Sequence, residues 1–254
     1  MLETGAHAAG KKKRGQAGET VYHRPVLCRV LSGLGTILLV SGSNTFGADF
    51  SSSVSPKDGW KLATDAKDVV IYSRPHADSN LKEFKAIGTI DAPSSAVGAV
   101  IDDFENYPKF MPYTLECRLI KREGDAVIGY QRVSPKICED RDYTLRVSKK
   151  SWPGPKGLTY LSQWQTANEL GPPEKKGVVR LKVCNGNWLL EPDGPTKTRA
   201  TYSIYSETGG VIPAFIANHA SLTAIKKLYA AIRKQVKEPQ YAAASPASPA
   251  AAKP

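Results

Sequence analysis

The chain has 254 residues and a formal net charge of +11, a length that suits one domain or two. The two ends are unusual in composition, and the remaining part of roughly 185 residues has the size of a single domain. The positive charge is compatible with binding to an anionic membrane or to nucleic acid, and with ordinary solvation of the surface. We expect no nucleic-acid partner.

The cysteines and histidines do not follow a metal-binding pattern. No Cys-x-x-Cys pair is present, and the four histidines lack metal-ligand spacing. We therefore expect neither a metal site nor a cofactor. A single disulfide between Cys138 and Cys184 stays open if the protein reaches an oxidising compartment.

The first 48 residues follow the order of a secretory signal. Residues 1–29 are polar and basic, residues 30–40 are apolar and uncharged, and small and polar residues continue to Ala48. The apolar run is too short to span a bilayer as a helix, which needs about 20 residues. We predict export to the periplasm with residues 1–48 as a signal peptide and residues 49–55 as a linker. An uncleaved membrane anchor and a buried helix are the alternatives.

The next part of the chain contains two helical patterns. Residues 60–66 predict a short amphipathic helix. Around residue 96 a second helical face begins, with Asp91 or Ser94 as its N-cap. Residues 104–112 are aromatic and punctuated by proline, which predicts a short helix or turn that covers an opening.

Strand patterns dominate the rest of the domain. The expected strands are, in chain order, residues 69–73, 81–91, 115–122, 126–133, 141–148, 158–165, 178–183 and 198–206. Proline and glycine separate them, and strands joined by such short links pair in antiparallel fashion.

The last ordered segment is an amphipathic helix. Apolar residues recur there at steps of three and four: Leu222, Ile225, Tyr229, Ile232 and Val236. This stripe predicts a helix of about 25 residues that starts near Pro213 and includes Phe215 in its apolar face. A long helix after a run of strands needs a sheet to pack against. The predicted fold class is therefore α+β, with a curved antiparallel sheet around the C-terminal helix. Residues 239–254 are rich in Pro, Ala and Ser and are expected to be disordered.

No strong catalytic motif occurs, and the candidate ligand-binding residues are polar and aromatic side chains of the strands and the last helix. Strand alternation places Arg141 on the face of Tyr143, and Arg132 on the face of Tyr130. An arginine on a mostly apolar face reaches an edge, pairs with an acid or meets a polar ligand group. His219 is either a structural residue or a polar contact inside a cavity. The full candidate set is Tyr130, Arg132, Arg141, Tyr143, Trp164, Tyr202, Phe215, Ile216 and His219.

Several short segments in this order resemble the START (StAR-related lipid transfer) domain. They are residues 106–112 (NYPKFMP), 130–133 (YQRV), 141–143 (RDY), 186–192 (GNWLLEP), 198–202 (TRATY) and 209–218 (GGVIPAFIAN). The resemblance covers about residues 56–238. The chain departs from it at Glu207-Thr208, where many members have Asp-Pro, and at Val147, where some sterol-binding members carry a buried arginine.

The START domain belongs to the helix-grip superfamily, together with polyketide cyclases and coenzyme Q-binding proteins. The resemblance implies a U-shaped antiparallel sheet and a C-terminal helix that enclose an apolar tunnel for one lipid. It implies a non-enzymatic, monomeric carrier that binds and transfers a hydrophobic ligand and touches anionic membranes transiently. A cyclase/aromatase-like enzyme using Arg132, Arg141, Tyr143 or His219 is one alternative, and a protein-binding module with a collapsed cavity is another.

Overall fold

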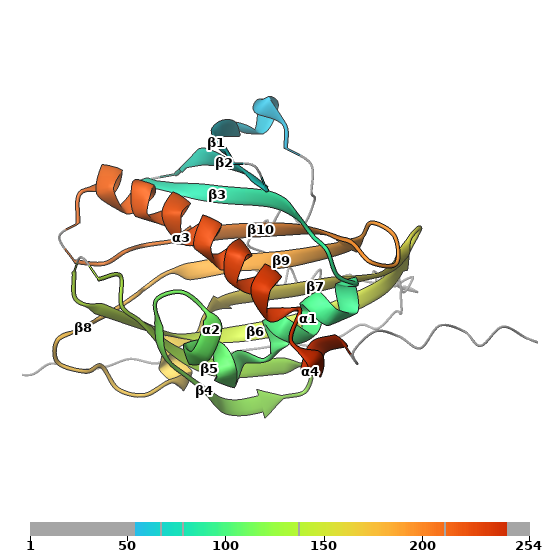
Figure 1. Cartoon of the computed structure of the whole chain (residues 1–254). Helices are drawn as coiled ribbons and strands as arrows, with labels where there is room; N and C mark the ends of the chain where they lie inside the picture. The colour runs from blue at the N-terminus through green and yellow to red at the C-terminus, as the bar shows by residue number, and fades with distance from the viewer. Residues whose placement is uncertain (1–53, 67, 78, 137, 211, 243–254) are drawn as a thin grey trace, which may run out of the picture. The chain divides into compact units, whose positions relative to one another are not determined.

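The computed structural model describes residues 54–242, except positions 67, 78, 137 and 211 (Figure 1). Ten strands form one sheet in this part of the chain: β1 (Lys61–Ala66), β2 (Val69–His76), β3 (Ser79–Ile90), β4 (Thr114–Glu123), β5 (Ala126–Val133), β6 (Asp140–Gly154), β7 (Gly157–Thr166), β8 (Val178–Arg180), β9 (Cys184–Pro192) and β10 (Thr198–Ser206). Their order is β1-β2-β3-β10-β9-β7-β6-β5-β4, and β8 pairs with β6. The recorded pairings are antiparallel, apart from the parallel pair of β6 and β8.

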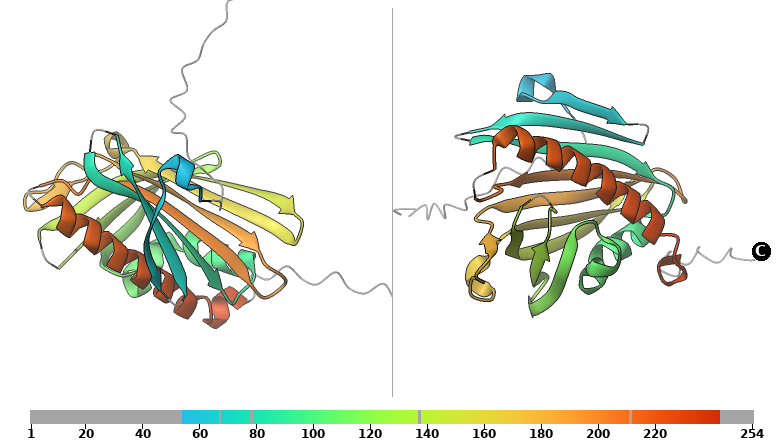
Figure 2. Two further views of the ribbon diagram at one scale, coloured as in Figure 1. Left: turned by 90° about the horizontal axis from the view of Figure 1, so that it is seen from above. Right: turned by 60° about the vertical axis from the view of Figure 1, so that its left-hand side comes forward.

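The long helix α3 (Ala214–Gln235) lies across the sheet, which curves around it (Figure 2). The predicted stripe forms its sheet-facing side, because Ile225, Tyr229 and Ile232 are all buried. The Tyr229 hydroxyl lies 3.0 Å from the carbonyl oxygen of Ala86 and 2.8 Å from that of Ala200. These contacts fix the helix to β3 and β10. The predicted α+β fold, a curved antiparallel sheet around a C-terminal helix, is confirmed.

Three shorter helices lie on the same face of the sheet as α3. Helix α1 (Ser94–Asp102) buries the predicted apolar face of Ala96, Val97, Val100 and Ile101. The one-turn helices η2 (Phe104–Asn106) and α2 (Tyr107–Phe110) follow directly, as residues 104–112 predicted. The N-cap is different from the expected Asp91 or Ser94. Pro93 occupies it without a side-chain cap, and Ser94 Oγ instead donates a 2.8 Å hydrogen bond to the Leu158 carbonyl of β7.

Two strands differ from the sequence-based expectation. Residues 61–66 form the edge strand β1 instead of a helix, because they pair with β2, while the neighbouring Trp60 is buried. Strand β9 was not predicted. Its consecutive buried residues Trp188, Leu189 and Leu190 break the alternation that identifies a strand with one exposed face. Only Val178–Arg180 of the expected strand at 178–183 is a strand.

The C-terminal boundary also lies later than expected. Residues 239–242 form the short helix α4 (Pro239–Ala242), and Tyr241 is buried. Its hydroxyl donates a 2.5 Å hydrogen bond to Asp103 Oδ2, just beyond α1. The expected disorder of this segment is therefore wrong as far as residue 242. The rest of the expected tail, the predicted signal at 1–48 and most of the linker at 49–55 lie outside the described residues.

Three further observations concern the described part of the chain. Cys117, Cys138 and Cys184 are free thiols there, so Cys138 and Cys184 do not pair. None of the helices between residues 54 and 242 has the length and apolar character needed to cross a membrane. The same residues contain no group of His, Cys, Asp and Glu side chains placed to hold a metal ion.

Candidate functional site

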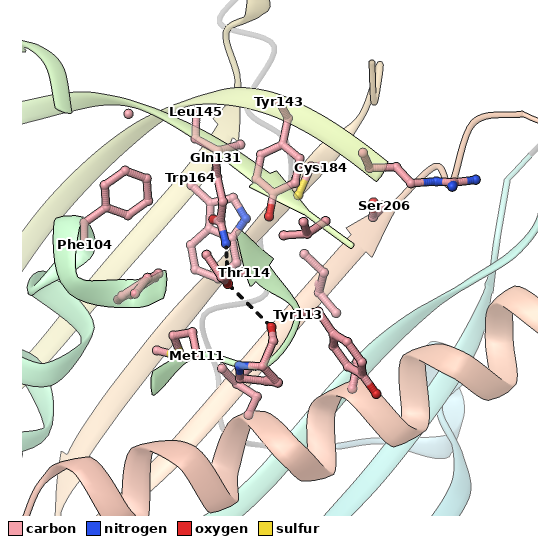
Figure 3. Close-up of a pocket in the computed structure, with 18 of the residues that line it drawn as sticks. Phe104, Met111, Tyr113, Thr114, Gln131, Tyr143, Leu145, Trp164, Cys184 and Ser206 are labelled. Atoms are coloured by element: carbon pink, nitrogen blue, oxygen red, sulfur yellow. Dashed lines mark hydrogen bonds between the residues drawn. The ribbon is translucent and has the colours of Figure 1, made fainter. Parts of the chain in front are cut away.

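A cavity of about 810 Å³ lies between the sheet and α3, and the segment from α1 to α2 forms part of its wall (Figure 3). Strands β4 to β7, β9 and β10 supply one side of it. Helix α3 contributes small side chains, including Ala220 and Ala224, and these leave room beneath the helix. Pockets for small organic molecules span about 300–1,000 Å³, so this space suits one such ligand.

Strand alternation decides which residues face the cavity. On β6 the cavity side carries Arg141, Tyr143, Leu145 and Val147, as the sequence pattern placed them together. On the neighbouring β5 the cavity side consists of alternate residues, among them Gln131. Gln131 pairs with Tyr143 in the sheet register, and residues paired across two strands share a face.

Glycines allow two aromatic side chains to pack closely against the strands. A Cβ atom at Gly129 of β5 would lie 2.6 Å from the ring of Phe104, and one at Gly186 of β9 would lie 2.6 Å from Trp164. Real Cβ atoms do not approach other atoms this closely. Both aromatic residues line the cavity (Figure 3). A larger side chain at either glycine would displace a ring of the cavity wall.

Arg141 is the buried cation of the wall, with 3% of its surface exposed. Its Nε donates a 3.2 Å hydrogen bond to the carbonyl oxygen of Thr208, and its Nη1 donates to the carbonyl oxygen of Glu139. These bonds join β6 to the segments before it and before α3. Its Nη2 is buried and has no hydrogen-bond partner among the described residues.

A group of neutral polar side chains continues the wall from Arg141. Tyr143 points its hydroxyl toward the interior (Figure 3), and burial raises its pKa well above the usual value. Burial also raises the pKa of Tyr202, and it raises the pKa of the Cys184 thiol to about 12. Tyr202 packs between two indole rings, with ring centroids 5.8 Å from Trp164 and 4.6 Å from Trp188. These groups therefore remain un-ionised near neutral pH.

Four residues of the candidate set line the cavity: Arg141, Tyr143, Trp164 and Tyr202. Tyr130 and Arg132 do not line it. The latter two alternate with the cavity-facing residues of β5 and so lie on the other face of the sheet. The Tyr130 hydroxyl donates a 3.0 Å hydrogen bond to Asp142 Oδ2 there. Arg132 Nε lies 3.8 Å from Glu116 Oε2, which corresponds to the ion-pair alternative.

The structure also places Phe215, Ile216 and His219 outside the cavity wall. All three are exposed, and Phe215 has 75% of its surface accessible. At about 100° per residue, positions two steps from the cavity-lining Ala217 lie about 160° away around the helix. Phe215 and His219 both stand two residues from Ala217 and thus point outward. The expected extension of the apolar stripe to Phe215 is wrong.

Comparison with known proteins shows which family the chain belongs to. Residues 90–233 match the family described as "Polyketide cyclase / dehydrase and lipid transport". The chain belongs to this family. An uncharacterised protein of Pseudomonas aeruginosa is 28% identical over 183 residues, which cover 70% of this chain and 89% of that protein. The phosphatidylcholine transfer protein of Mus musculus is 27% identical over 165 residues, 64% of this chain and 76% of that protein.

Solved structures of similar proteins have the same fold. A STAR-related lipid transfer protein from Xanthomonas axonopodis superposes with a TM-score of 0.63 at 25% identity, over 71% of this chain and all of that fragment. Human StAR-related lipid transfer protein 5 gives a TM-score of 0.61 at 20% identity, over 71% of this chain and 87% of that one, which supports the fold alone. The resemblance to START domains in the sequence is confirmed.

The two departures from the START pattern both lie at the cavity. Thr208, where many family members have proline, lines the wall and its carbonyl oxygen accepts the hydrogen bond of Arg141. Val147, where some sterol-binding members have a buried arginine, is an apolar part of the wall. In this family member the buried positive charge of β6 therefore stands at Arg141.

Sequence reasoning missed several wall residues that the family fold brings together. Gln131 Nε2 donates a 3.2 Å hydrogen bond to Thr114 Oγ1, and both residues line the cavity (Figure 3). Gln131 could have been found from the register of β5 against β6, but the pairing of those strands is not visible in the sequence. Phe104 and Met111 come from the segment that was expected to cover an opening, and they do line the cavity.

Proposed function

We propose that this protein is a non-enzymatic carrier that binds one lipid or similar hydrophobic molecule in the cavity and transfers it between membranes. The observation that carries the proposal is the cavity itself, which is large enough for one ligand and has mostly apolar residues with a few polar groups on its wall. The similarity to a phosphatidylcholine transfer protein and to a STAR-related lipid transfer protein supports the same function.

Hydrocarbon burial provides the affinity in this proposal. Each buried methylene group contributes about 0.8 kcal/mol, and apolar residues on the sheet side of the cavity, such as Val127, Leu145 and Val147, offer contacts to a hydrocarbon chain. The polar groups then orient one end of the ligand. A positive chain is also attracted to anionic lipid surfaces, which favours the transient membrane contact that loading and unloading require.

The raised pKa values of ionisable wall residues favour a carrier over a cyclase-like enzyme. Acid–base catalysis works best with a group whose pKa lies near the working pH. Burial moves the pKa of Tyr143 upward, away from neutral pH, and it raises that of Cys184 to about 12. His219, which was considered for this role, is exposed and lies outside the cavity wall.

A transfer assay with a cavity-filled variant tests the carrier function. Ala224 lines the cavity from α3, whereas Ala230 on the same helix is exposed. The wild-type protein and the Ala230→Trp control are expected to speed the movement of a fluorescent phosphatidylcholine from donor to acceptor vesicles. Ala224→Trp is expected to lose this activity while it remains folded. Equal rates for both variants, or no transfer by the wild type, would contradict the proposal.

We also propose that the protein is exported to the periplasm and acts there as a monomer. The basic and then apolar order of residues 1–48 supports export. Cell fractionation with N-terminal sequencing of the product tests it, and a cytosolic chain that begins at Met1 would contradict it. Size-exclusion chromatography with light scattering tests the monomeric state.

A further inference from the structure

The buried charge of Arg141 lacks a matching buried anion among the described residues. The recorded carboxylate near its guanidinium belongs to Glu139, whose Oε2 lies 3.8 Å from Nη1 and whose side chain is 65% exposed. A contact that is this long and this accessible to water is weak. The Nη2 group makes no hydrogen bond to any described residue.

Two other groups of charged wall residues have partners within the protein. Lys149 Nζ forms a 2.6 Å ion pair with Asp102, and both residues line the cavity. Asp103 accepts hydrogen bonds from Tyr241 at 2.5 Å and from Asn106 at 2.7 Å. Arg141 differs from these wall residues, because the N–H bonds of its buried Nη2 have no acceptor among the described residues.

A buried donor without an acceptor is costly, and a buried charge without a partner is more costly still. A guanidinium offers parallel N–H bonds that match the oxygens of a carboxylate or a phosphate. Tyr143 stands two residues along β6 on the same face, about 7 Å away along the strand. Its hydroxyl points toward the interior (Figure 3) and can donate to the same anionic group.

We propose that the ligand of this cavity is an anionic amphiphile whose carboxylate or phosphate accepts hydrogen bonds from Arg141 Nη2 and the Tyr143 hydroxyl. Its hydrocarbon part lies along the apolar wall, where Leu145 and Trp164 are exposed to the interior (Figure 3). This inference rests on the proposed carrier function and adds the chemical class of the ligand.

Three amphiphiles with the same hydrocarbon chain test the inference: oleic acid, oleyl phosphate and oleyl alcohol. Each is used to displace a fluorescent fatty-chain probe from the protein below its aggregation concentration. The wild type is expected to bind at least one of the two anions about tenfold or more tightly than the alcohol, the scale of a hydrogen bond to a charged group. The comparison of oleic acid with oleyl phosphate shows which anion the site prefers.

Arg141→Met is expected to reduce the affinity for the preferred anion by about 10- to 100-fold and to leave that for oleyl alcohol within about twofold. Tyr143→Phe should give a smaller loss in the same direction. Arg132→Met is the matched control, because it removes the same charge from the other face of the sheet. It should leave all three affinities unchanged, and circular dichroism checks that each variant is folded.

The outcomes separate this inference from the carrier function. If the wild type binds the alcohol and both anions equally, the anionic class is wrong and the carrier proposal stands. If it binds none of the three and transfers no lipid, the carrier proposal fails and the inference fails with it. An equal loss in Arg132→Met and Arg141→Met would overturn the assignment to Arg141. Should Arg141→Met not fold, the preference of the wild type among the three amphiphiles still decides the question.

Discussion

Arg141 and Asp142 are adjacent and buried on β6, yet their side chains lie on opposite faces of the sheet and have different partners. Asp142 accepts hydrogen bonds from Arg180 Nε at 2.7 Å and from Arg180 Nη2 at 3.1 Å. Tyr130 donates a third bond to it. Arg141 faces the cavity and donates hydrogen bonds to two backbone carbonyl oxygens. One dipeptide thus combines a structural charge pair with a charge that is available to a ligand.

The first prediction concerns the structural pair. Asp142→Asn leaves the mostly buried Arg180 without its counter-charge, and the free energy of unfolding should fall by about 3–5 kcal/mol. Glu116→Gln is the control, because this partly exposed partner of Arg118 and Arg132 should contribute at most about 1 kcal/mol. Urea denaturation measures both. Equal losses for the two variants would show that Asp142 is not a buried structural anion.

The second prediction concerns the contact between α3 and the sheet. Ile232 is fully buried and is not part of the cavity wall, so Ile232→Ala should create a new void and cost about 2–5 kcal/mol. Ile225→Ala should lie near the lower end of this range, because Ile225 already borders the cavity. The exposed Lys234→Ala should stay within about 0.5 kcal/mol. A small effect of Ile232→Ala would mean that the stripe does not pack against the sheet.

The sequence could predict which residues share a face but could not always predict which face is inside. The alternation on β6 grouped Arg141 with Tyr143 correctly, and the alternation on β5 grouped Tyr130 with Arg132. Only the register, in which Tyr143 pairs with Gln131, shows that the group on β5 faces away from the cavity. Register depends on contacts between strands, and one sequence does not display these.

The remaining errors also follow from tertiary contacts. The helical stripe was placed correctly from Leu222 to Val236, where a sheet lies beneath it, but it does not continue to Phe215. Strand β9 was not predicted because the adjacent residues Leu189 and Leu190, which point to opposite faces of the sheet, are both buried. Local periodicity identifies elements with one exposed face better than elements that are covered on both.

The third prediction is a pH dependence. Burial and the hydrogen bond to Asp142 raise the pKa of Tyr130 to about 12. An unfolded tyrosine ionises near pH 10, so above about pH 10 the unfolded chain loses a proton that the folded chain keeps. The stability from this group is complete below that pH and is lost as the pH rises toward the folded pKa.

Tyr130→Phe should therefore make the loss of unfolding free energy at alkaline pH shallower than in the wild type. Urea denaturation at several pH values between neutral and strongly alkaline conditions measures this difference. Parallel pH profiles for the two proteins would contradict the role given to the Tyr130 hydroxyl.

The fourth prediction concerns thiol reactivity. Because the thiolate is the nucleophile, a pKa of about 12 leaves the folded Cys184 unreactive at mildly alkaline pH. Iodoacetamide at pH 8 should therefore modify Cys184 in urea but not in the native protein. Peptide mass spectrometry of the two samples measures the modification. Rapid labelling of Cys184 in the native state would show that this part of the cavity wall is open.

Native mass spectrometry tests the central claim most directly. The protein is incubated with lipid vesicles, and the vesicles are then removed. The wild type and Ala230→Trp should each retain one bound amphiphile per chain, which organic extraction then identifies. Ala224→Trp should carry none, because its side chain occupies the cavity. A wild-type protein that stays bare, or an adduct that persists in Ala224→Trp at the same level, would contradict the claim that this cavity holds a lipid.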